Sequence, residues 1–390
     1  MDTSRLGSSP SGRLITVGKG EGAYRAFMPD PLPPQLSVDW DLARSLSEAD
    51  RALSELAGVG RTLPNPHLLI GPFVRREAVL SSRIEGTRAD IADLYAYEVG
   101  QLPLPGLEPP PSEVDVHEVL NYVRALEYGL ERLATLPVSL RLIRELHERL
   151  LVGVRGEHAT PGQFRSSQNW IGPPNCSLSE ARFVPPPVPQ MHEALAALER
   201  YLHNGDTHPP LVRLALLHYQ FEVIHPFIDG NGRIGRLLLS LLLVEWGLLT
   251  LPLLYLSAFF HRRRQEYYDL LMAVSERAVW RDWIVFFLQG VAEQAQDAIV
   301  RAQQLQDLQT AWHKRLADAR SALPLRLADA LFDSPVLTIP QAQRHLDVTY
   351  RTAQRNISKL VDAGILQQVG ESSYSKTFVA AEILHAIGGS

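Results

Sequence analysis

Apolar residues recur at every third or fourth position through most of this chain, which is the spacing of amphipathic helices. The pattern predicts helices from 190 to about 289 and, before them, five helices at 38–58, 74–85, 88–98, 114–133 and 139–151. Residues 237–260 are leucine-rich and long enough to span a bilayer. Glu245 interrupts this run and Gly247 and Pro252 break it, so we expect a buried core helix and no membrane span.

Three segments lack the helical pattern. Residues 1–35 are rich in Ser, Gly and Pro, and we expect a loose leader. Residues 102–111 are rich in proline and indicate a linker. Residues 157–189 contain short β-prone pieces at 169–171 and 182–184 between glycines and prolines, which predicts a loop with a short hairpin.

A long helix is predicted over residues 291–320, where apolar residues are spaced by three and four. Its apolar stripe either packs on the chain itself or forms the interface of a homodimer. Pro324 marks the next boundary. The expected organisation is a flexible leader, an N-terminal helical region, a core, a connecting helix and a small C-terminal domain, at 1–35, 36–112, 113–290, 291–322 and 323–390.

Composition narrows the class of protein. The 390 residues allow two or three domains, and 45% hydrophobic residues with a net charge of -5 exclude a disordered chain and a globally basic nucleic-acid coat. The single cysteine, Cys176, excludes an intrachain disulfide and a cysteine-based zinc cage. The 13 histidines include no HExxH pattern, so we expect no structural zinc. No apolar signal segment is present at the start, and we expect a cytoplasmic protein.

The densest polar chemistry lies in residues 225–236, HPFIDGNGRIGR, between two strongly helical segments. Gly230, Asn231 and Gly232 all tolerate a positive φ, so we expect their N–H groups to converge into a nest that binds an anion. The positive end of the following helix faces the same place. A P-loop is excluded because no Gly-Lys-Ser/Thr follows the glycines.

Four charged or titratable side chains accompany this glycine loop. Arg233 and Arg236 are three residues apart, so both can lie on one helix face beside the anion. Asp229 offers a hard oxygen ligand that suits Mg²⁺. His225 precedes a proline, which favours an extended position beside the nest and a role as general base. Together these residues predict a phosphate site with a base at its rim.

This segment resembles the HPFx(D/E)GNGRxxR motif of the Fic family at every defined position. Further segments resemble the family's flap region and nucleotide-pocket helices, at 161–165, 169–172, 181–187, 254–257 and 267–268. The resemblance covers about residues 35–290. It implies an all-α Fic fold with a short β-hairpin flap.

The resemblance implies transfer of AMP from ATP to a Tyr, Thr or Ser hydroxyl of a target protein or of the protein itself, with release of diphosphate. His225 would deprotonate the hydroxyl, Asp229 would hold Mg²⁺, and Phe183 and Val184 in the flap would dock the target as an added strand. Arg236 would hold the γ-phosphate. The implied nucleotide contacts are Glu85, Asp229, Gly230, Asn231, Gly232, Arg233, Arg236, Tyr255 and Arg262.

Doc-type members of the family phosphorylate their target instead, and they carry a small side chain at the second glycine of the motif. Gly232 keeps this position open here, which favours AMP transfer. Transfer of another nucleotide group or of phosphocholine stays an alternative.

An inhibitory motif is also indicated upstream. Ser81, Glu85 and Gly86 resemble the (S/T)xxxE(G/N) motif of Fic proteins that carry an N-terminal inhibitory helix. A carboxylate at the C-terminal end of a helix is unfavourable, so Glu85 gains from a cationic partner. The resemblance implies that this partner is Arg236 and that the pair blocks the γ-phosphate of ATP.

The C-terminal segment resembles a winged helix-turn-helix domain. Helices are expected at 325–332, 339–346 and 350–363, followed by a hairpin over 365–379. In the third helix Arg351, Arg355 and Lys359 lie on the face opposite the apolar stripe, where they would meet DNA. Residues 321–390 hold six basic and six acidic side chains, so protein contact is the alternative. The rival function is a DNA-binding transcription regulator whose Fic domain senses nucleotide.

Overall fold

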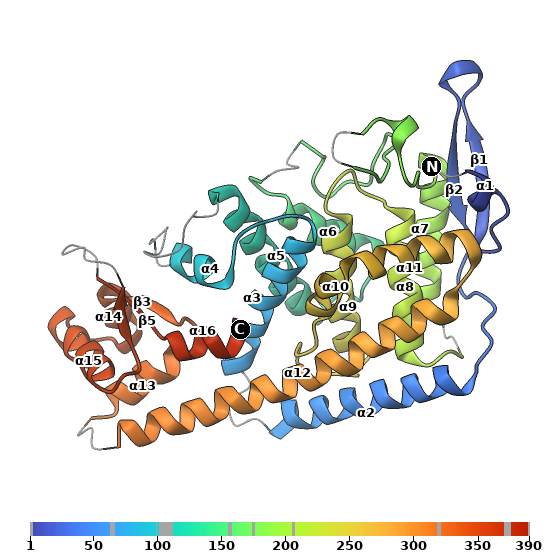
Figure 1. The fold of residues 1–390 in the computed structure, drawn as a ribbon. Helices are drawn as coiled ribbons and strands as arrows, with labels where there is room; N and C mark the ends of the chain where they lie inside the picture. Colours follow the sequence, from blue (N-terminus) through green and yellow to red (C-terminus); the bar gives the residue numbers. More distant parts are fainter. Residues whose placement is uncertain are drawn as a thin grey trace. The chain divides into compact units, whose positions relative to one another are not determined.

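The computed structural model describes residues 3–62, 67–98, 100, 112–154, 158–173, 176–204, 207–317, 321–369 and 376–388 (Figure 1). Helices dominate these residues, as the hydrophobic spacing predicted. The chain divides into two compact units that interleave in sequence. The first unit takes residues 1–54, 124–249 and 254–294, and the second takes 55–123, 250–253 and 295–390.

The first unit is built around α8, Pro210–Ile224. This helix is apolar on nearly every side, so it is buried all round and packs against its neighbours in the centre of the unit. Trp283 fixes one side by donating its Nε1–H to the Ala215 carbonyl at 2.9 Å. The surrounding helices are α6 Leu140–Leu150, α7 Val188–His203, α9 Asn231–Glu245, α10 Ser257–Arg262 and α11 Arg264–Arg277.

The expectation of a loose leader is wrong over the described residues. After the short helix α1, Thr3–Gly7, strands β1 (Gly12–Val17) and β2 (Tyr24–Pro29) form an antiparallel hairpin. Phe27 is fully buried and its N–H donates to the Val184 carbonyl at 2.9 Å. The Ser- and Gly-rich composition gave no signal of this strand pair. Its second strand is short but gains stability by burying apolar side chains against the flap.

The flap region, residues 161–187, contains less β-structure than the sequence predicted. The expected hairpin is reduced to one antiparallel bridge between Ile171 and Phe183. A 3₁₀ turn, Leu178–Glu180, begins with a capping box at Ser177 and occupies part of the intervening segment. In this turn, backbone N–H and carbonyl groups that could have paired in a longer hairpin form hydrogen bonds with each other and with the capping side chains.

The second unit combines early and late parts of the chain. Its helices are α3 His67–Ile84, α4 Ile91–Glu98, α13 Leu323–Ala330, α14 Ile339–Leu346, α15 Tyr350–Asp362 and α16 Ala381–Gly388. Three short antiparallel strands have the order β3-β5-β4, with bounds Val336–Thr338, Thr377–Val379 and Gln367–Val369. The turn of the expected wing, 370–375, and the expected linker, 102–111, lie outside the described residues.

The C-terminal sheet shares its core with α4. Tyr95 of α4 is fully buried and clusters with Val336 of β3 and Val379 of β5. Helix α16, which the sequence pattern did not predict, contacts both α3 and α4. The expected region 323–390 therefore packs together with earlier helices of the second unit.

Three helices belong to both units, namely α2 Trp40–Thr62, α5 Glu113–Arg132 and α12 Trp280–Arg315. The predicted connecting helix is the later part of α12, which begins eleven residues earlier than the expected start at 291. Most of its apolar stripe is buried within the chain, including Ala295, Ala302, Leu305 and Trp312. The packing alternative therefore accounts for that stripe.

The first part of the leucine-rich stretch, up to Glu245, belongs to α9, whose residues from Leu237 to Leu243 are buried in the first unit. The predicted core helix is confirmed over these residues, and the stretch leaves the helix before α10 begins at Ser257. In the described part of the chain, no helix is long and apolar enough to cross a membrane.

Candidate active site

His225 lies at the C-terminal end of α8. Its N–H donates to the Phe221 carbonyl at 3.0 Å, and its backbone is left-handed, with φ 49° and ψ 61°. The sequence correctly placed this residue outside the helix, but the extended backbone expected before Pro226 is wrong. The left-handed turn satisfies a carbonyl of the last helical turn, and that is a common way for a helix to end.

A backbone carbonyl fixes the tautomer of His225. The imidazole Nδ1 lies 3.1 Å from the Glu222 carbonyl oxygen. Because a carbonyl can only accept, Nδ1 carries the proton and Nε2 carries the lone pair. The side chain is partly exposed, so this Nε2 is placed to act as a base.

The loop after His225 is closed by one asparagine. Asn231 binds both backbone groups of Phe227: its Oδ1 accepts from the N–H and its Nδ2 donates to the carbonyl, each at 2.8 Å. Phe227 is fully buried, and its ring stacks on His147 with centroids 3.7 Å apart. The loop geometry is therefore set by the protein before any ligand arrives.

The anion site begins at Gly230, the N-cap of α9, which has φ 79°. The nest predicted over three residues is wrong in part, because Asn231 and Gly232 already belong to the helix. The first helical hydrogen bond runs from the Ile234 N–H to the Gly230 carbonyl at 3.0 Å. The earlier N–H groups of α9 lack acceptors in the helix, and Gly230 has no side chain to cap them, which favours an anion there.

The two arginines of the motif are buried in α9, with exposed fractions of 4% for Arg233 and 2% for Arg236. Arg233 approaches Asp229, with 3.5 Å between Nη2 and Oδ2. Its Nε and Nη1 are buried and have no hydrogen-bond partner among the residues that the structure describes. Buried donors without acceptors are costly, so this guanidinium fits a site that is completed by an anionic ligand.

Asp229 combines a fixed backbone with an accessible carboxylate. Its Oδ1 accepts from the Gly230 N–H at 2.7 Å, and about half of its side chain is exposed. The carboxylate therefore lies beside the N-terminus of α9 and can offer a hard oxygen to a divalent cation.

His147 is a site residue that the sequence analysis did not identify. Its Nδ1 accepts from the Gly162 N–H and its Nε2 donates to the Asp229 carbonyl, both at 3.0 Å. Burial lowers the pKa of His147 to about 4, so the ring is neutral at pH 7. His147 belongs to no recognised motif, and its spacing on α6 gives no signal of this role.

Arg165 and Asn169 also reach the loop that begins at His225. Both donate to the His225 carbonyl, Arg165 through Nε at 3.1 Å and Asn169 through Nδ2 at 3.2 Å. They lie in segments that resemble the family's flap, but the sequence did not reveal their role. His218, in contrast, lies in the core: it is buried, with Nε2 2.8 Å from the Tyr267 hydroxyl.

The predicted nucleotide-pocket residues lie around α10. Tyr255 is buried just before this helix, and Arg262 is its last residue. Arg262 is about half exposed and forms a close ion pair with Glu293 of α12. Their contacts with a nucleotide stay a prediction.

The flap residues predicted to dock a target are buried and already bonded. The N–H and carbonyl of Phe183 both pair with Ile171, at 3.0 and 2.8 Å, and the Val184 carbonyl accepts from Phe27. Three of their four backbone groups are therefore used within the chain. Target docking by strand addition at Phe183 and Val184 stays a prediction.

The remaining predicted residues lie in the second unit. Ser81 is fully buried in α3, Glu85 is exposed one residue beyond that helix, and Gly86 has φ 100°, a left-handed turn that is common at a helix end. On α15, Arg351 and Arg355 are exposed and Lys359 is partly exposed.

Taken together, the fold and the site define a class of helical proteins in which a histidine ends one helix and an anion site begins the next. Residues 43–131 match the family described as Fic/DOC family N-terminal, and residues 137–243 match the one described as Fic/DOC family. The chain belongs to this family, and it carries both a Fic N-terminal domain and a Fic domain.

The relatives agree with this assignment. The chain is 34% identical over 213 residues to a probable protein adenylyltransferase of Aquifex aeolicus (strain VF5), a match that covers 53% of this chain and 57% of the relative. It is 32% identical over 173 residues to the protein adenylyltransferase Fic of Drosophila ananassae, covering 42% of this chain and 30% of that protein. The chain thus spans less than two thirds of either relative.

Among solved structures, a Fic family protein from Desulfovibrio desulfuricans G20 is similar in fold, with a TM-score of 0.56. The match covers 89% of this chain and 98% of that chain at 20% sequence identity. This likeness supports the all-α Fic fold predicted from the sequence.

Proposed function

We propose that this protein is an adenylyltransferase that moves AMP from ATP to a hydroxyl group of a protein. The observation that carries the proposal is the buried Arg233 beside the N-terminus of α9, whose Nε and Nη1 find no hydrogen-bond partner in the described part of the chain. Such donors suit phosphate oxygens, and the base His225, at the end of α8, precedes Arg233 by eight residues. The names of the relatives support the same activity.

The reaction needs a base and a stabilised leaving group. Nε2 of His225 takes the proton of a Tyr, Thr or Ser hydroxyl, and the hydroxyl oxygen attacks the α-phosphorus of ATP. A new oxygen–phosphorus bond forms to the target, the bond between the α-phosphorus and the bridging oxygen breaks, and diphosphate leaves. Arg233 and the first N–H groups of α9 stabilise the charge on the phosphate oxygens, and Arg236 contacts the γ-phosphate.

Magnesium fits the residues present at this site. The Asp229 carboxylate is accessible and hard, and it lies against the anion site. Bound there, Mg²⁺ would neutralise charge on the α- and β-phosphates. Because ATP is supplied in the cytoplasm, a cytoplasmic location agrees with this activity.

Self-inhibition is part of the proposal. Glu85 is an exposed carboxylate directly after α3, and Gly86 ends the helix at that point. By pairing with Arg236, Glu85 would take the group that holds the γ-phosphate. ATP would then bind without the geometry needed for transfer.

The test is ATP labelled on the α-phosphate. The Glu85→Gly protein, used in place of the wild type to raise the signal, should retain the label on a protein hydroxyl. His225→Ala in that background should retain no label while it still binds ATP, because the base does not hold the phosphates. His203→Ala changes an exposed histidine of α7 and serves as the matched control. Label retained at full level by His225→Ala would contradict the proposal.

A parallel sample with ATP labelled on the γ-phosphate separates AMP transfer from phosphorylation. Retention of the γ-label with loss of the α-label would show a kinase and overturn the adenylyltransferase proposal.

A second function is favoured by one observation. Arg351 and Arg355 are exposed on α15, opposite the buried Ala353 and Ile357, so a basic face is available to duplex DNA. DNA binding and AMP transfer are compatible activities of one chain. Contact with a protein, including a second copy of this chain, is the competing use of the face.

A further inference from the structure

We propose that Arg165 is a positioning residue that holds the catalytic histidine through its backbone and ties that backbone to the flap. The inference rests on the proposed function only in naming His225 as the base. Arg165 is 1% exposed, and its side-chain donors span two segments of the first unit.

The need for such a residue comes from the backbone of His225. A left-handed conformation, with φ 49° and ψ 61°, is unfavourable for a residue that carries a Cβ atom. It persists only where the surroundings hold it in place. The Nδ1–H bond of His225 to the Glu222 carbonyl depends on that same conformation, because the backbone torsions set where the imidazole lies.

Arg165 and Asn169 fix the backbone of His225 through hydrogen bonds from their side chains. Both donate to the His225 carbonyl, at 3.1 and 3.2 Å, which satisfies both lone pairs of that oxygen. The backbone N–H of Arg165 donates in addition to the next carbonyl, Pro226, at 2.9 Å. Asn169 extends the contact to the Phe227 carbonyl at 2.7 Å. Three successive carbonyls are therefore fixed by two residues.

The other end of the guanidinium reaches the flap. Nη2 of Arg165 makes a close hydrogen bond to the Pro186 carbonyl, and Nη1 donates to the Ser167 carbonyl at 3.2 Å. Gln168 adds a neighbouring bond to the Pro185 carbonyl at 3.0 Å. The Arg165 side chain therefore connects His225 with Pro186, which follows the predicted docking residues Phe183 and Val184.

Only arginine has the shape for this arrangement. Its planar fork directs Nε, Nη1 and Nη2 to three carbonyls at once, whereas a lysine offers a single nitrogen. Burial lowers the pKa of Arg165 to about 10, which leaves it charged at pH 7. Arg165→Lys keeps the charge and removes the fork, so it separates positioning from charge.

The experiment compares Arg165→Lys with Arg213→Lys in the Glu85→Gly background. Arg213 is partly buried in the same unit and also donates to a backbone carbonyl, that of Leu202, but outside the site. Arg165→Lys should lower kcat for AMP transfer at least tenfold while the Kd for ATP changes less than threefold. Arg213→Lys should leave kcat within twofold. A folded Arg165→Lys protein with wild-type kcat, or with equal losses in kcat and ATP affinity, would overturn the proposal.

A second variant covers the case in which Arg165→Lys does not fold. Asn169→Asp is nearly isosteric but replaces the donating amide by a carboxylate, so the His225 carbonyl loses a donor. It should lower kcat in the same direction as Arg165→Lys. Unchanged kcat in folded Asn169→Asp would show that donation to the His225 carbonyl does not position the base.

An NMR measurement tests positioning without any turnover. In protein with ¹⁵N-labelled histidines, the His225 signal is assigned by its loss in His225→Ala. It should show a protonated Nδ1 in the wild type and a mixture of tautomers in Arg165→Lys. Unchanged tautomer populations in Arg165→Lys would refute positioning. If the wild type transfers no AMP, the proposed function fails, and this measurement still decides the role of Arg165.

Discussion

Backbone partners decide the protonation of two histidines at the site. At His225 a carbonyl accepts from Nδ1, so the lone pair is on Nε2. At His147 an N–H donates to Nδ1, so the proton is on Nε2. The two rings therefore have opposite tautomers, and only His225 is placed to take a proton from a substrate. His147 instead holds the Asp229 carbonyl and positions the candidate metal ligand.

At this scale the first prediction concerns Asp229. Asp229→Ala removes the accessible carboxylate beside the anion site, so AMP transfer should fall at least a hundredfold and lose its response to added Mg²⁺. The measurement is transfer of α-labelled AMP over a Mg²⁺ series, with EDTA as the zero point. Asp269→Ala, on α11, is the matched control. Wild-type Mg²⁺ dependence in Asp229→Ala would show that the metal is held elsewhere.

The sequence predicted the site only where its residues are contiguous. Residues 225–236 form one segment, so spacing alone placed a base, an acid and two arginines together. The left-handed His225 could not be predicted, because local proline preferences favour an extended residue and tertiary hydrogen bonds override them. Arg165 is 60 residues from His225, and His147 is 82 from Asp229, so periodicity carries no signal for either contact.

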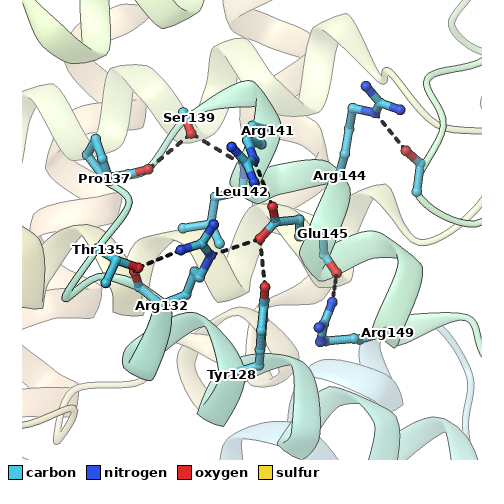
Figure 2. A network of polar contacts seen from close by, with 11 residues as sticks. Tyr128, Arg132, Thr135, Pro137, Ser139, Arg141, Leu142, Arg144, Glu145 and Arg149 are labelled. Carbon is cyan, nitrogen blue, oxygen red and sulfur yellow. Dashed lines mark hydrogen bonds and ion pairs between the residues drawn. The ribbon is translucent and has the colours of Figure 1, made fainter.

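At the scale of elements, the corner between α5 and α6 is held by one carboxylate (Figure 2). Glu145 accepts from the Tyr128 hydroxyl at 2.7 Å, from Arg132 at 3.2 Å and from Arg141 at 2.9 Å. Its own carbonyl accepts from Arg149 at 3.0 Å. Helix α6 carries His147 two residues further on, so this network also positions the histidine that contacts the Asp229 carbonyl.

The second prediction is a pH dependence of stability at this corner. Hydrogen bonds from Tyr128, then Arg132 and Arg141, lower the pKa of Glu145 to about 2, below the usual value of 4.5. A lowered folded-state pKa stabilises the protein above pH 4.5, and this contribution is lost as the pH falls through about 2. Glu145→Gln should therefore be less stable than wild type by up to about 1 kcal/mol at pH 7.

The difference in stability between wild type and Glu145→Gln should become smaller below pH 4.5. Urea unfolding midpoints at pH 7, 4.5 and 3 measure it. Glu131→Gln, an exposed acid on α5, should show no such convergence. An equal difference in stability at pH 7 and pH 3 would mean that Glu145 stabilises the corner through its packing and not through its charge.

The end of α3 carries the third prediction. If Glu85 occupies Arg236, its removal frees the arginine for the γ-phosphate. Glu85→Gly should then raise self-modification by about tenfold or more, since each 1.4 kcal/mol of barrier corresponds to about tenfold in rate. The measurement is incorporation of α-labelled AMP over time at saturating ATP.

Double substitution identifies the mechanism behind that increase. Arg236→Ala removes the γ-phosphate contact together with the block, so Glu85→Gly combined with Arg236→Ala should behave like Arg236→Ala alone. Wild-type self-modification and wild-type ATP affinity in Glu85→Gly would refute the inhibitory role and leave the assignment of His225 intact.

For the whole molecule, the two units show why domain boundaries could not be predicted from the sequence. The expected regions were contiguous, at 36–112, 113–290 and 323–390, and were separated at prolines and glycines. In the structure three of the divisions fall at 54, 123 and 294, inside α2, α5 and α12, and the other two fall at 249 and 253, between α9 and α10. A boundary within a continuous helix produces no change in composition or periodicity, so no local signal marks it.

The fourth prediction concerns DNA binding by the full chain. A basic side chain that binds a DNA phosphate contributes about 1 to the slope of log K against log salt. Arg351→Ala with Arg355→Ala should therefore weaken binding to duplex DNA and lower that slope by about 2. Gel shifts over a salt series measure both, with Lys314→Ala of α12 as control. Wild-type protein that gives no salt-sensitive shift would assign the face to protein contact.

The hairpin of β1 and β2 determines how a shortened version of this protein would behave in solution. The family match begins at residue 43, beyond the end of β2 at Pro29. A protein cut there would lose Ala26, which packs against Ala181 and Val184. The uncovered apolar surface and the unpaired Val184 carbonyl would favour strand pairing between molecules, so we expect such a truncated protein to precipitate on purification.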